Sequence, residues 1–271
     1  MGITNNSEEK YLYKYLPFNQ YSLQLLINQK FYLSAPNLLN DPFEGDFIIS
    51  NYSNLYNEKT FNFLINKREI DSNAWINNHN KETTLKNWRL NERDFELYLY
   101  EFLNKSIRSK FGTTSFSKEC NSIDMWSHYA DSHNGFVLIF DRDLLADQYE
   151  ILNFIIDVDY DTIPNVEVNP EDLTIDNDNI LLKNKLPEWS KEKEVRIIKK
   201  YWLDKGYENE YSRLLEFPPE SIIGVIYGLN MSIENLLTID HLLLQLKSKE
   251  IKTYYAKKNH KRDKIIFKEF E

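Results

Sequence analysis

Residues 187–198 (PEWSKEKEVRII) contain the side chains best suited to acid–base or electrostatic chemistry. Alternate side chains of a strand face the same side, so Glu192, Glu194 and Arg196 are predicted to form one row. Trp189 precedes this row. Two carboxylates beside a guanidinium form either a ladder of exposed ion pairs, which contributes little energy, or the wall of a polar site. Only the second arrangement would support chemistry.

A second polar group lies in residues 37–44 (NLLNDPFE). Asn40 and Asp41 precede Pro42, and Asp41 is suited to cap a turn at this position. Glu44 has no such role in a turn. Asn40, Asp41 and Glu44 are therefore further candidate site residues, with turn formation as the structural alternative for the first two. Lys185, farther along the chain, is interpreted as a surface lysine.

Several common types of site are absent from the sequence. It has neither the glycine-rich loop of dinucleotide-binding folds nor the phosphate-binding loop of nucleoside triphosphatases. No metal is expected, because His128 and His133 are the only close pair of histidines and Cys120 is the only cysteine. One cysteine excludes a disulfide within the chain and fits a reducing compartment, so we expect a cytoplasmic protein.

The composition limits the class of partner. The 271 residues carry a net charge of −9, which argues against non-specific coating of nucleic acid. No run of about 18 apolar residues occurs, so we expect no membrane partner. Hydrophobic residues make up 42% of the chain, including 18 Tyr and 16 Phe, and provide ample material for a core.

The elements that must position these residues follow from hydrophobic periodicity and turn signals. Strands are predicted at residues 11–15, 31–34, 111–116, 136–140, 152–160, 192–198, 222–227, 252–256 and near 265. Helices are predicted at 19–28, capped by Asn19, at 122–130, capped by Ser122, and at 232–247. Residues 51–110 have helical spacings throughout and are interpreted as a helical insertion, with a loop near 77–80. Together these elements indicate a single α+β domain over residues 11–271, after a flexible tail at 1–10.

Five segments, taken in order, resemble a bacterial family known as domain of unknown function 2971. They are LYKY at residues 12–15, FYLSAPNLLNDPFEGDF at 31–47, FGTTSFS at 111–117, MWSHYADSHNGFVLIFD at 125–141 and KLPEWSKEKEVRII at 185–198. The helical insertion lies outside the resemblance. The family name states no activity.

Three of these segments also resemble, more weakly, the signatures of the ADP-ribosyltransferase superfamily. Lys14 stands where that superfamily has Arg or His on an early strand. Thr113-Thr114-Ser115 stands for its S-T-S strand, and Glu192-Lys193-Glu194 for its catalytic E-x-E. The resemblance implies a mixed, split central sheet and NAD as the substrate. It also implies ADP-ribosyl transfer or NAD glycohydrolysis, in the setting of a bacterial toxin or anti-phage effector.

The resemblance further implies a role for each residue. Glu194 would stabilise the oxocarbenium-like ribose formed when nicotinamide leaves, and Glu192 would orient the acceptor or act as a base. Lys14 would contact a phosphate or ribose, and aromatic rings would stack on the nicotinamide or adenine. The residues so assigned to nucleotide binding are Tyr13, Lys14, Tyr15, Thr113, Ser115, Trp126, His128 and Tyr129. Lys14, Ser115 and Glu194 are expected to surround one pocket.

Two other classes of function fit the same residues. A nuclease or other hydrolase would hold a divalent cation between Asp41, Glu44, Glu192 and Glu194. A non-catalytic module would use the same cup to sense a nucleotide or bind a partner. For a transferase, the acceptor would be a protein, a nucleic acid or water.

Overall fold

The computed structural model describes residues 10–70, 81–147, 155–176, 178, 180–200, 213–246 and 251–270. The predicted tail, apart from residue 10, and the predicted loop at 77–80 lie outside these residues. None of the helices in the described part is long and apolar enough to cross a membrane.

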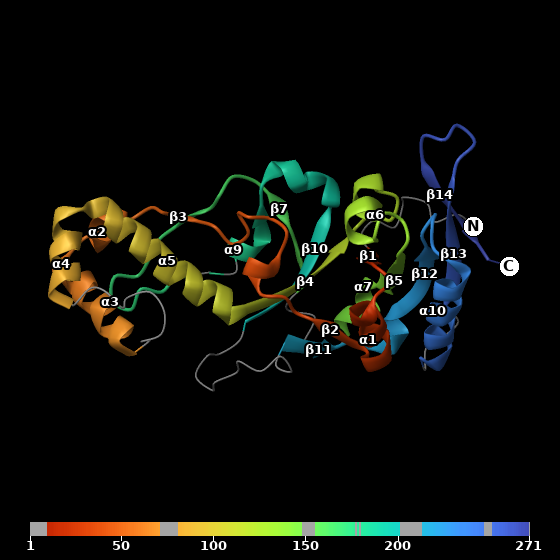
Figure 1. Ribbon diagram of the computed structural model, residues 1–271, viewed down its shortest axis with the longest axis horizontal. Helices are drawn as coiled ribbons and strands as arrows, with labels where there is room; N and C mark the ends of the chain where they lie inside the picture. Colours follow the sequence, from red (N-terminus) through yellow and green to blue (C-terminus); the bar gives the residue numbers. More distant parts are fainter. Residues whose placement is uncertain are drawn as a thin grey trace.

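Within the described residues, the centre of the fold is an eight-stranded mixed sheet with the order β14-β13-β12-β5-β1-β4-β10-β6 (Figure 1). Its strands are β1 (Tyr11–Leu16), β4 (Phe111–Ser117), β5 (Phe136–Asp141), β6 (Ile155–Asp157), β10 (Glu194–Lys200), β12 (Ile222–Tyr227), β13 (Lys252–Lys258) and β14 (Ile265–Glu269). Strands β12 and β13 pair in parallel, whereas the other neighbours are antiparallel. The predicted α+β class with a mixed central sheet is confirmed.

Three small pairs of strands surround this sheet. They are β2 (Lys30–Tyr32) with β11 (Leu214–Glu216), β3 (Ile48–Ile49) with β8 (Asn165–Val166), and β7 (Asp159–Tyr160) with β9 (Asn184–Lys185). Short helical segments lie between strands along the chain: η2 (Pro36–Leu38), α7 (Arg142–Ala146), α9 (Ile180–Lys183), η3 (Pro187–Glu192) and η6 (Pro219–Ser221).

The two faces of the sheet are covered by different helices. Helices α1 (Gln20–Asn28) and α10 (Ile233–Gln245) pack on the face that contains Leu138. Helix α6 (Ile123–Tyr129) covers the opposite face, where Trp126 packs edge-on against Tyr15. The predicted caps are confirmed, because Asn19 accepts hydrogen bonds from the first turn of α1 and Ser122 from that of α6.

The predicted helical insertion contains α2 (Tyr52–Leu55), α3 (Glu58–Ile70), α4 (Lys81–Leu90) and α5 (Glu92–Lys110). In α5 the buried side chains Phe95, Leu99, Leu103 and Ile107 recur every four residues, so one stripe faces a separate core. Figure 1 shows this helical lobe at one end of an elongated molecule, with β14 at the other.

Strands β1 and β4 are joined at a single residue pair, Tyr13 with Ser117, whereas β4 and β10 pair over seven residues. The sheet therefore opens between β1 and β4. The Lys14 ammonium fills this opening by donating to the Ser115 carbonyl at 3.0 Å and the Thr114 hydroxyl at 2.7 Å. The opening lies beside the side chains that form the candidate site.

Candidate functional site

A cavity of about 140 Å³ lies on the α6 side of the sheet, where β1, β4 and β10 meet. Its floor contains Tyr13, Tyr15, Ser115 and Ser117. These residues share a face because Tyr13 pairs with Ser117, and alternate residues of a strand point the same way. The loop after η2, helix α6 and strand β9 complete its walls.

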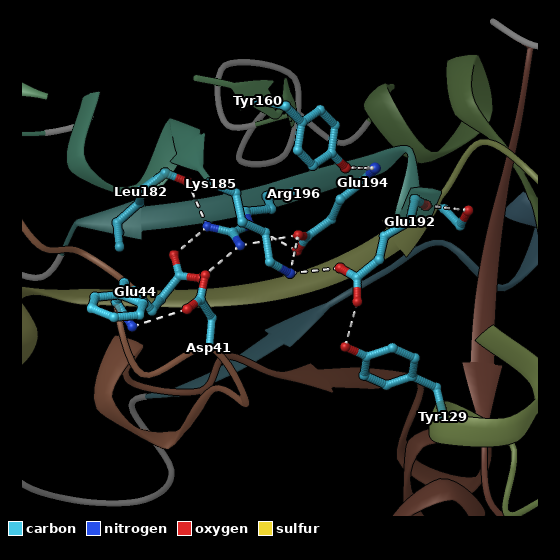
Figure 2. A network of polar contacts seen from close by, with 11 residues as sticks. Asp41, Glu44, Tyr129, Tyr160, Leu182, Lys185, Glu192, Glu194 and Arg196 are labelled. Atoms are coloured by element: carbon cyan, nitrogen blue, oxygen red, sulfur yellow. Dashed lines mark hydrogen bonds and ion pairs between the residues drawn. The ribbon is translucent and has the colours of Figure 1, made fainter. Parts of the chain in front are cut away.

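Arg196 organises the buried side of this cavity (Figure 2). Its Nε donates to Glu194 at 2.7 Å, and its Nη2 donates to Glu194 at 3.0 Å and to Glu44 at 2.9 Å. Its Nη1 donates to Glu44 and, at 2.7 Å, to the Leu182 carbonyl. The side chain is only 1% exposed. All five N–H donors of the guanidinium are therefore used within the protein, so Arg196 has none left for a ligand.

The loop between η2 and β3 brings Glu44 to Arg196. Asp41 accepts a hydrogen bond from the Phe43 N–H at 2.9 Å, and the Glu44 N–H donates to the Asp41 carbonyl. Gly45 follows with φ of 75°, a conformation that suits glycine. The predicted turn role of Asp41 is confirmed, and its side chain also lines the cavity.

Lys185 links the two glutamates of the E-x-E sequence. Its ammonium lies 2.5 Å from a Glu192 oxygen and 3.1 Å from a Glu194 oxygen, and it also sits over the Trp189 ring at 4.6 Å. The second Glu192 oxygen accepts a hydrogen bond from the Tyr129 hydroxyl at 2.7 Å. The interpretation of Lys185 as a surface lysine is wrong, because the residue is 8% exposed.

A change in backbone conformation between η3 and β10 lets Glu192 and Glu194 reach the same cavity. Glu192 ends η3, Lys193 adopts a left-handed conformation with φ of 46°, and β10 begins at Glu194. The prediction that the strand includes Glu192 is therefore wrong, because β10 begins two residues later, at Glu194. The Ser117 hydroxyl donates to the Glu192 carbonyl, and the Glu194 N–H donates to the Tyr160 hydroxyl. These hydrogen bonds fix the backbone on both sides of Lys193.

The ionisation of these groups follows from burial and from their partners. Burial raises the pKa of Glu194, but Arg196 and Lys185 outweigh this effect and hold the pKa at about 2. For Glu44 burial dominates, and its pKa is raised despite the neighbouring Arg196. Burial lowers the pKa of Arg196, but Glu194 and Glu44 reverse this and raise it above its ordinary value. Burial and the bond to Glu192 raise the pKa of Tyr129, so its phenol stays protonated.

The carboxylates of the cavity differ in how fully they are bound. Glu194 meets Arg196 through both oxygens and Lys185 through one, and it also accepts a hydrogen bond from Ser115. Glu192 has one partner on each oxygen and retains acceptor capacity toward the cavity. Glu192 is therefore the glutamate best placed to contact a ligand, whereas Glu194 holds the site together.

Charge is unbalanced around the cavity. Four carboxylic residues line it, against two basic ones. The acidic residues are Asp41, Glu44, Glu192 and Glu194, and the basic ones are Lys185 and Arg196. Ionised carboxylates thus outnumber cations when all four are charged, and the three tyrosines that line the cavity, Tyr13, Tyr15 and Tyr129, are neutral because their pKa values are raised.

Most of the residues singled out from sequence come together here. The cavity is lined by Tyr13, Tyr15, Asn40, Asp41, Glu44, Ser115, Tyr129, Glu192, Glu194 and Arg196. Asn40 also bonds the Tyr129 hydroxyl. The ion pairs do not form an exposed ladder, because Glu194 is 5% and Arg196 1% exposed.

Lys14 does not face this cavity, so the expectation that it does is wrong. Its neighbours Leu12 and Leu16 point into the core beneath α1 and α10, and its ammonium lies over the Phe116 ring at 4.9 Å and the Phe31 ring at 5.7 Å. Tyr13 and Tyr15 alternate with it and face the other side. The sheet therefore separates Lys14 from a ligand in the cavity.

Four other predicted residues also lie outside the cavity wall. Trp126 is fully buried and donates to the Cys120 carbonyl, so it belongs to the core. His128 is exposed on α6. Thr113 is buried beside Ser34, two residues before Ser115 on β4. The Trp189 ring packs against the Lys185 ammonium.

Sequence analysis missed Lys185, Tyr160 and Ser117. Lys185 could have been found from the sequence, because two glutamates that are buried together require a second cation besides Arg196. Tyr160 could not, since its contact with Glu194 depends on the pairing of β7 with β9.

Metal ligation and thiol chemistry have little geometric support. No group of three or more His, Cys, Asp or Glu side chains in the described part of the chain is arranged to hold a metal ion. Burial raises the pKa of Cys120 to about 12, so its thiol is protonated and unreactive at neutral pH.

The segment that contributes much of this cavity matches a known protein family. Residues 125–197 match the family of proteins of unknown function DUF2971. The match confirms the resemblance to domain of unknown function 2971, and its range includes Tyr129, Lys185, Glu192, Glu194 and Arg196. Searches of curated proteins and of solved structures give no match. The DUF2971 segment thus supplies four of the six acidic and basic residues that line the cavity, whereas Asp41 and Glu44 come from outside the matched range.

Proposed function

We propose that this cavity binds the nicotinamide–ribose part of NAD and cleaves its N-glycosidic bond, as a glycohydrolase or an ADP-ribosyltransferase. The observation that carries the proposal is a cavity lined by an excess of carboxylates and by three tyrosine rings. The nicotinamide ring of NAD is cationic, and the ribose becomes cationic as the bond breaks. Both charges are stabilised by such surroundings, whereas a phosphate would be repelled.

Glu192 is the proposed catalytic residue. In hydrolysis the bond between ribose C1′ and the nicotinamide nitrogen breaks, and both of its electrons go to the nitrogen, which releases neutral nicotinamide. A water molecule then bonds to C1′ and loses a proton to Glu192. Tyr129 and Lys185 each hold this carboxylate by one hydrogen bond. The ion pair of Glu194 with Arg196 fixes the start of β10, which follows Glu192 in the chain.

This assignment exchanges the roles that the superfamily resemblance implies for the two glutamates. Glu194 is occupied by Arg196, Lys185 and Ser115, so it is a positioning residue in this proposal. Lys14 has no role, because it lies across the sheet. The pyrophosphate and adenosine of NAD would extend outward from the cavity, away from its carboxylates.

The experiment is to incubate the purified protein with NAD and follow nicotinamide and ADP-ribose by chromatography. Release of both supports hydrolysis, and release of nicotinamide with ADP-ribose attached to an added macromolecule supports transfer. Thermal stabilisation by NAD without any product would instead indicate a sensor. Stabilisation by Mg²⁺ or Mn²⁺ but not by NAD would favour a metal-dependent hydrolase and contradict the proposal.

The biological setting follows from the same activity. We propose a toxin or anti-phage effector, whose expression in a bacterium should deplete cellular NAD. The Glu192→Gln variant, expressed to the same level, should leave the NAD content unchanged.

A further inference from the structure

The hairpin formed by β13 and β14 concentrates positive charge in an acidic protein. Residues 257–264 contain five basic side chains and one acidic one, whereas the whole chain has a net charge of −9. The basic residues are Lys257, Lys258, Lys261, Arg262 and Lys264, and all five are exposed. Figure 1 shows the hairpin projecting beyond the sheet, at the end of the molecule opposite the helical lobe.

The turn of this hairpin is held in one shape by its own side chains. The Asn259 side chain donates to Asp263 at 2.6 Å and accepts from the N–H groups of Asp263 and Lys264. The Arg262 N–H donates to the Asn259 carbonyl, and Arg262 has φ of 59°. Asp263, the one acidic residue of the segment, is thus bound to the turn.

The five basic side chains take part in no ion pair within the part of the chain that the structure describes. They also lie on both faces of the hairpin, because Lys257 and Lys258 are consecutive in β13 and point to opposite sides. Charge on both sides of a narrow ribbon fits a groove bordered by two phosphate backbones. A flat anionic membrane surface would meet only one of these sides.

From these observations we propose that the β13–β14 hairpin docks in the major groove of double-stranded DNA and contacts its phosphates. The major groove admits a two-stranded β-ribbon, and lysines and arginines on both sides of the ribbon would reach the two strands. The contacts are electrostatic, so binding is independent of base sequence and falls steeply with salt. The acidic remainder of the protein is repelled, which confines the contact to the hairpin.

The test uses the full chain and a fluorescent 20-base-pair duplex, with the dissociation constant measured by anisotropy from 50 to 200 mM NaCl. The hairpin variant replaces Lys257, Lys258, Lys261 and Arg262 with Gln. The control replaces four exposed lysines elsewhere, Lys59, Lys67, Lys86 and Lys191, with Gln, so that the net charge changes equally.

We expect the hairpin variant to bind at least tenfold more weakly than wild type at 50 mM NaCl. The slope of log K against log salt should fall by about 0.9 for each phosphate that the variant no longer neutralises. The control variant should bind within about twofold of wild type. Three results would overturn the proposal: no binding by wild type at 50 mM NaCl, equal weakening in both variants, or binding to vesicles of anionic phospholipid but not to DNA.

Discussion

Glu44 and Arg196 form a bidentate ion pair between positions 152 residues apart in the chain. The pair joins the loop after η2 to strand β10 of the central sheet. Both side chains are almost completely buried, so the loop that carries Asp41 is fixed to the strand that follows Glu192. The shape of the cavity therefore depends on this contact.

Removing the guanidinium should strongly destabilise the fold. In Arg196→Met the carboxylates of Glu44 and Glu194 remain buried without their main cation, and such a loss typically costs about 3–5 kcal/mol. Chemical denaturation measures this cost. Arg89→Met removes an exposed pair with Glu58 and is the matched control, for which we expect little change. Equal stability of the two variants would contradict the structural role of Arg196.

The low pKa of Glu194 predicts a loss of stability in acid. The folded-state pKa of about 2 lies below the unfolded value of about 4.3, so the unfolded state binds the proton first as the pH falls. The stability contributed by ionised Glu194 is present above about pH 4.3 and is lost as the pH falls toward 2. Glu44, whose pKa is raised, opposes this trend.

Comparison with Glu194→Gln isolates the contribution of Glu194. The difference in unfolding free energy between wild type and this variant should be largest at neutral pH and should shrink between pH 5 and pH 2. A difference that is constant with pH would show that Glu194 is not held ionised. Because Glu194 is buried in the ion-pair cluster, the variant should also melt at a lower temperature.

Lys14 should weaken stability at neutral pH rather than support catalysis. Burial lowers its pKa to about 8, despite an opposing effect of Glu194, against about 10.4 in the unfolded chain. Between these values the unfolded state binds more protons, so the stability of wild type relative to Lys14→Met should rise from pH 7 to pH 10, by about 1–3 kcal/mol. Nicotinamide release at pH 7 should be unchanged in the variant. A large loss of turnover in a folded Lys14→Met protein would place the lysine back in the site.

Tyr129 is predicted to position Glu192. Tyr129→Phe keeps the ring but removes the 2.7 Å hydrogen bond to the carboxylate, so turnover should fall roughly tenfold, equivalent to about 1.4 kcal/mol. The loss should appear in kcat, with the KM for NAD nearly unchanged, because the ring that lines the cavity is kept. A lower melting temperature with an unaltered kcat would mean that the hydroxyl has only a structural role.

The local elements of the fold were predictable because they depend on neighbouring residues. Asn19 and Ser122 cap helices by contacts within three residues, and residues 136–140 form a central strand because their apolar run fits burial on both faces. The helical insertion followed from spacing in the same way. The left-handed Lys193 that ends η3 carried no such signal, so the start of β10 was misplaced.

The site was predictable only in part, because its charges pair over long distances. Glu192, Glu194 and Arg196 were found from one short segment, and Glu44 from its lack of a turn role. The burial of Lys185 depends on the pairing of strand β9 with β7. Whether the Lys14 side chain faces the cavity depends on which side of β1 helix α6 covers. Neither arrangement is encoded in local periodicity.

The central claim, that Glu192 acts on a ribosyl–nicotinamide bond, is tested most directly by single-turnover release of nicotinamide from NAD. Glu192→Gln should slow this release by about 10²–10⁴-fold while the protein remains folded. Glu188→Gln, which changes an exposed glutamate of the same η3 segment, should release nicotinamide at the wild-type rate. Release by folded Glu192→Gln at the wild-type rate, or no release by the wild-type protein, would contradict the account.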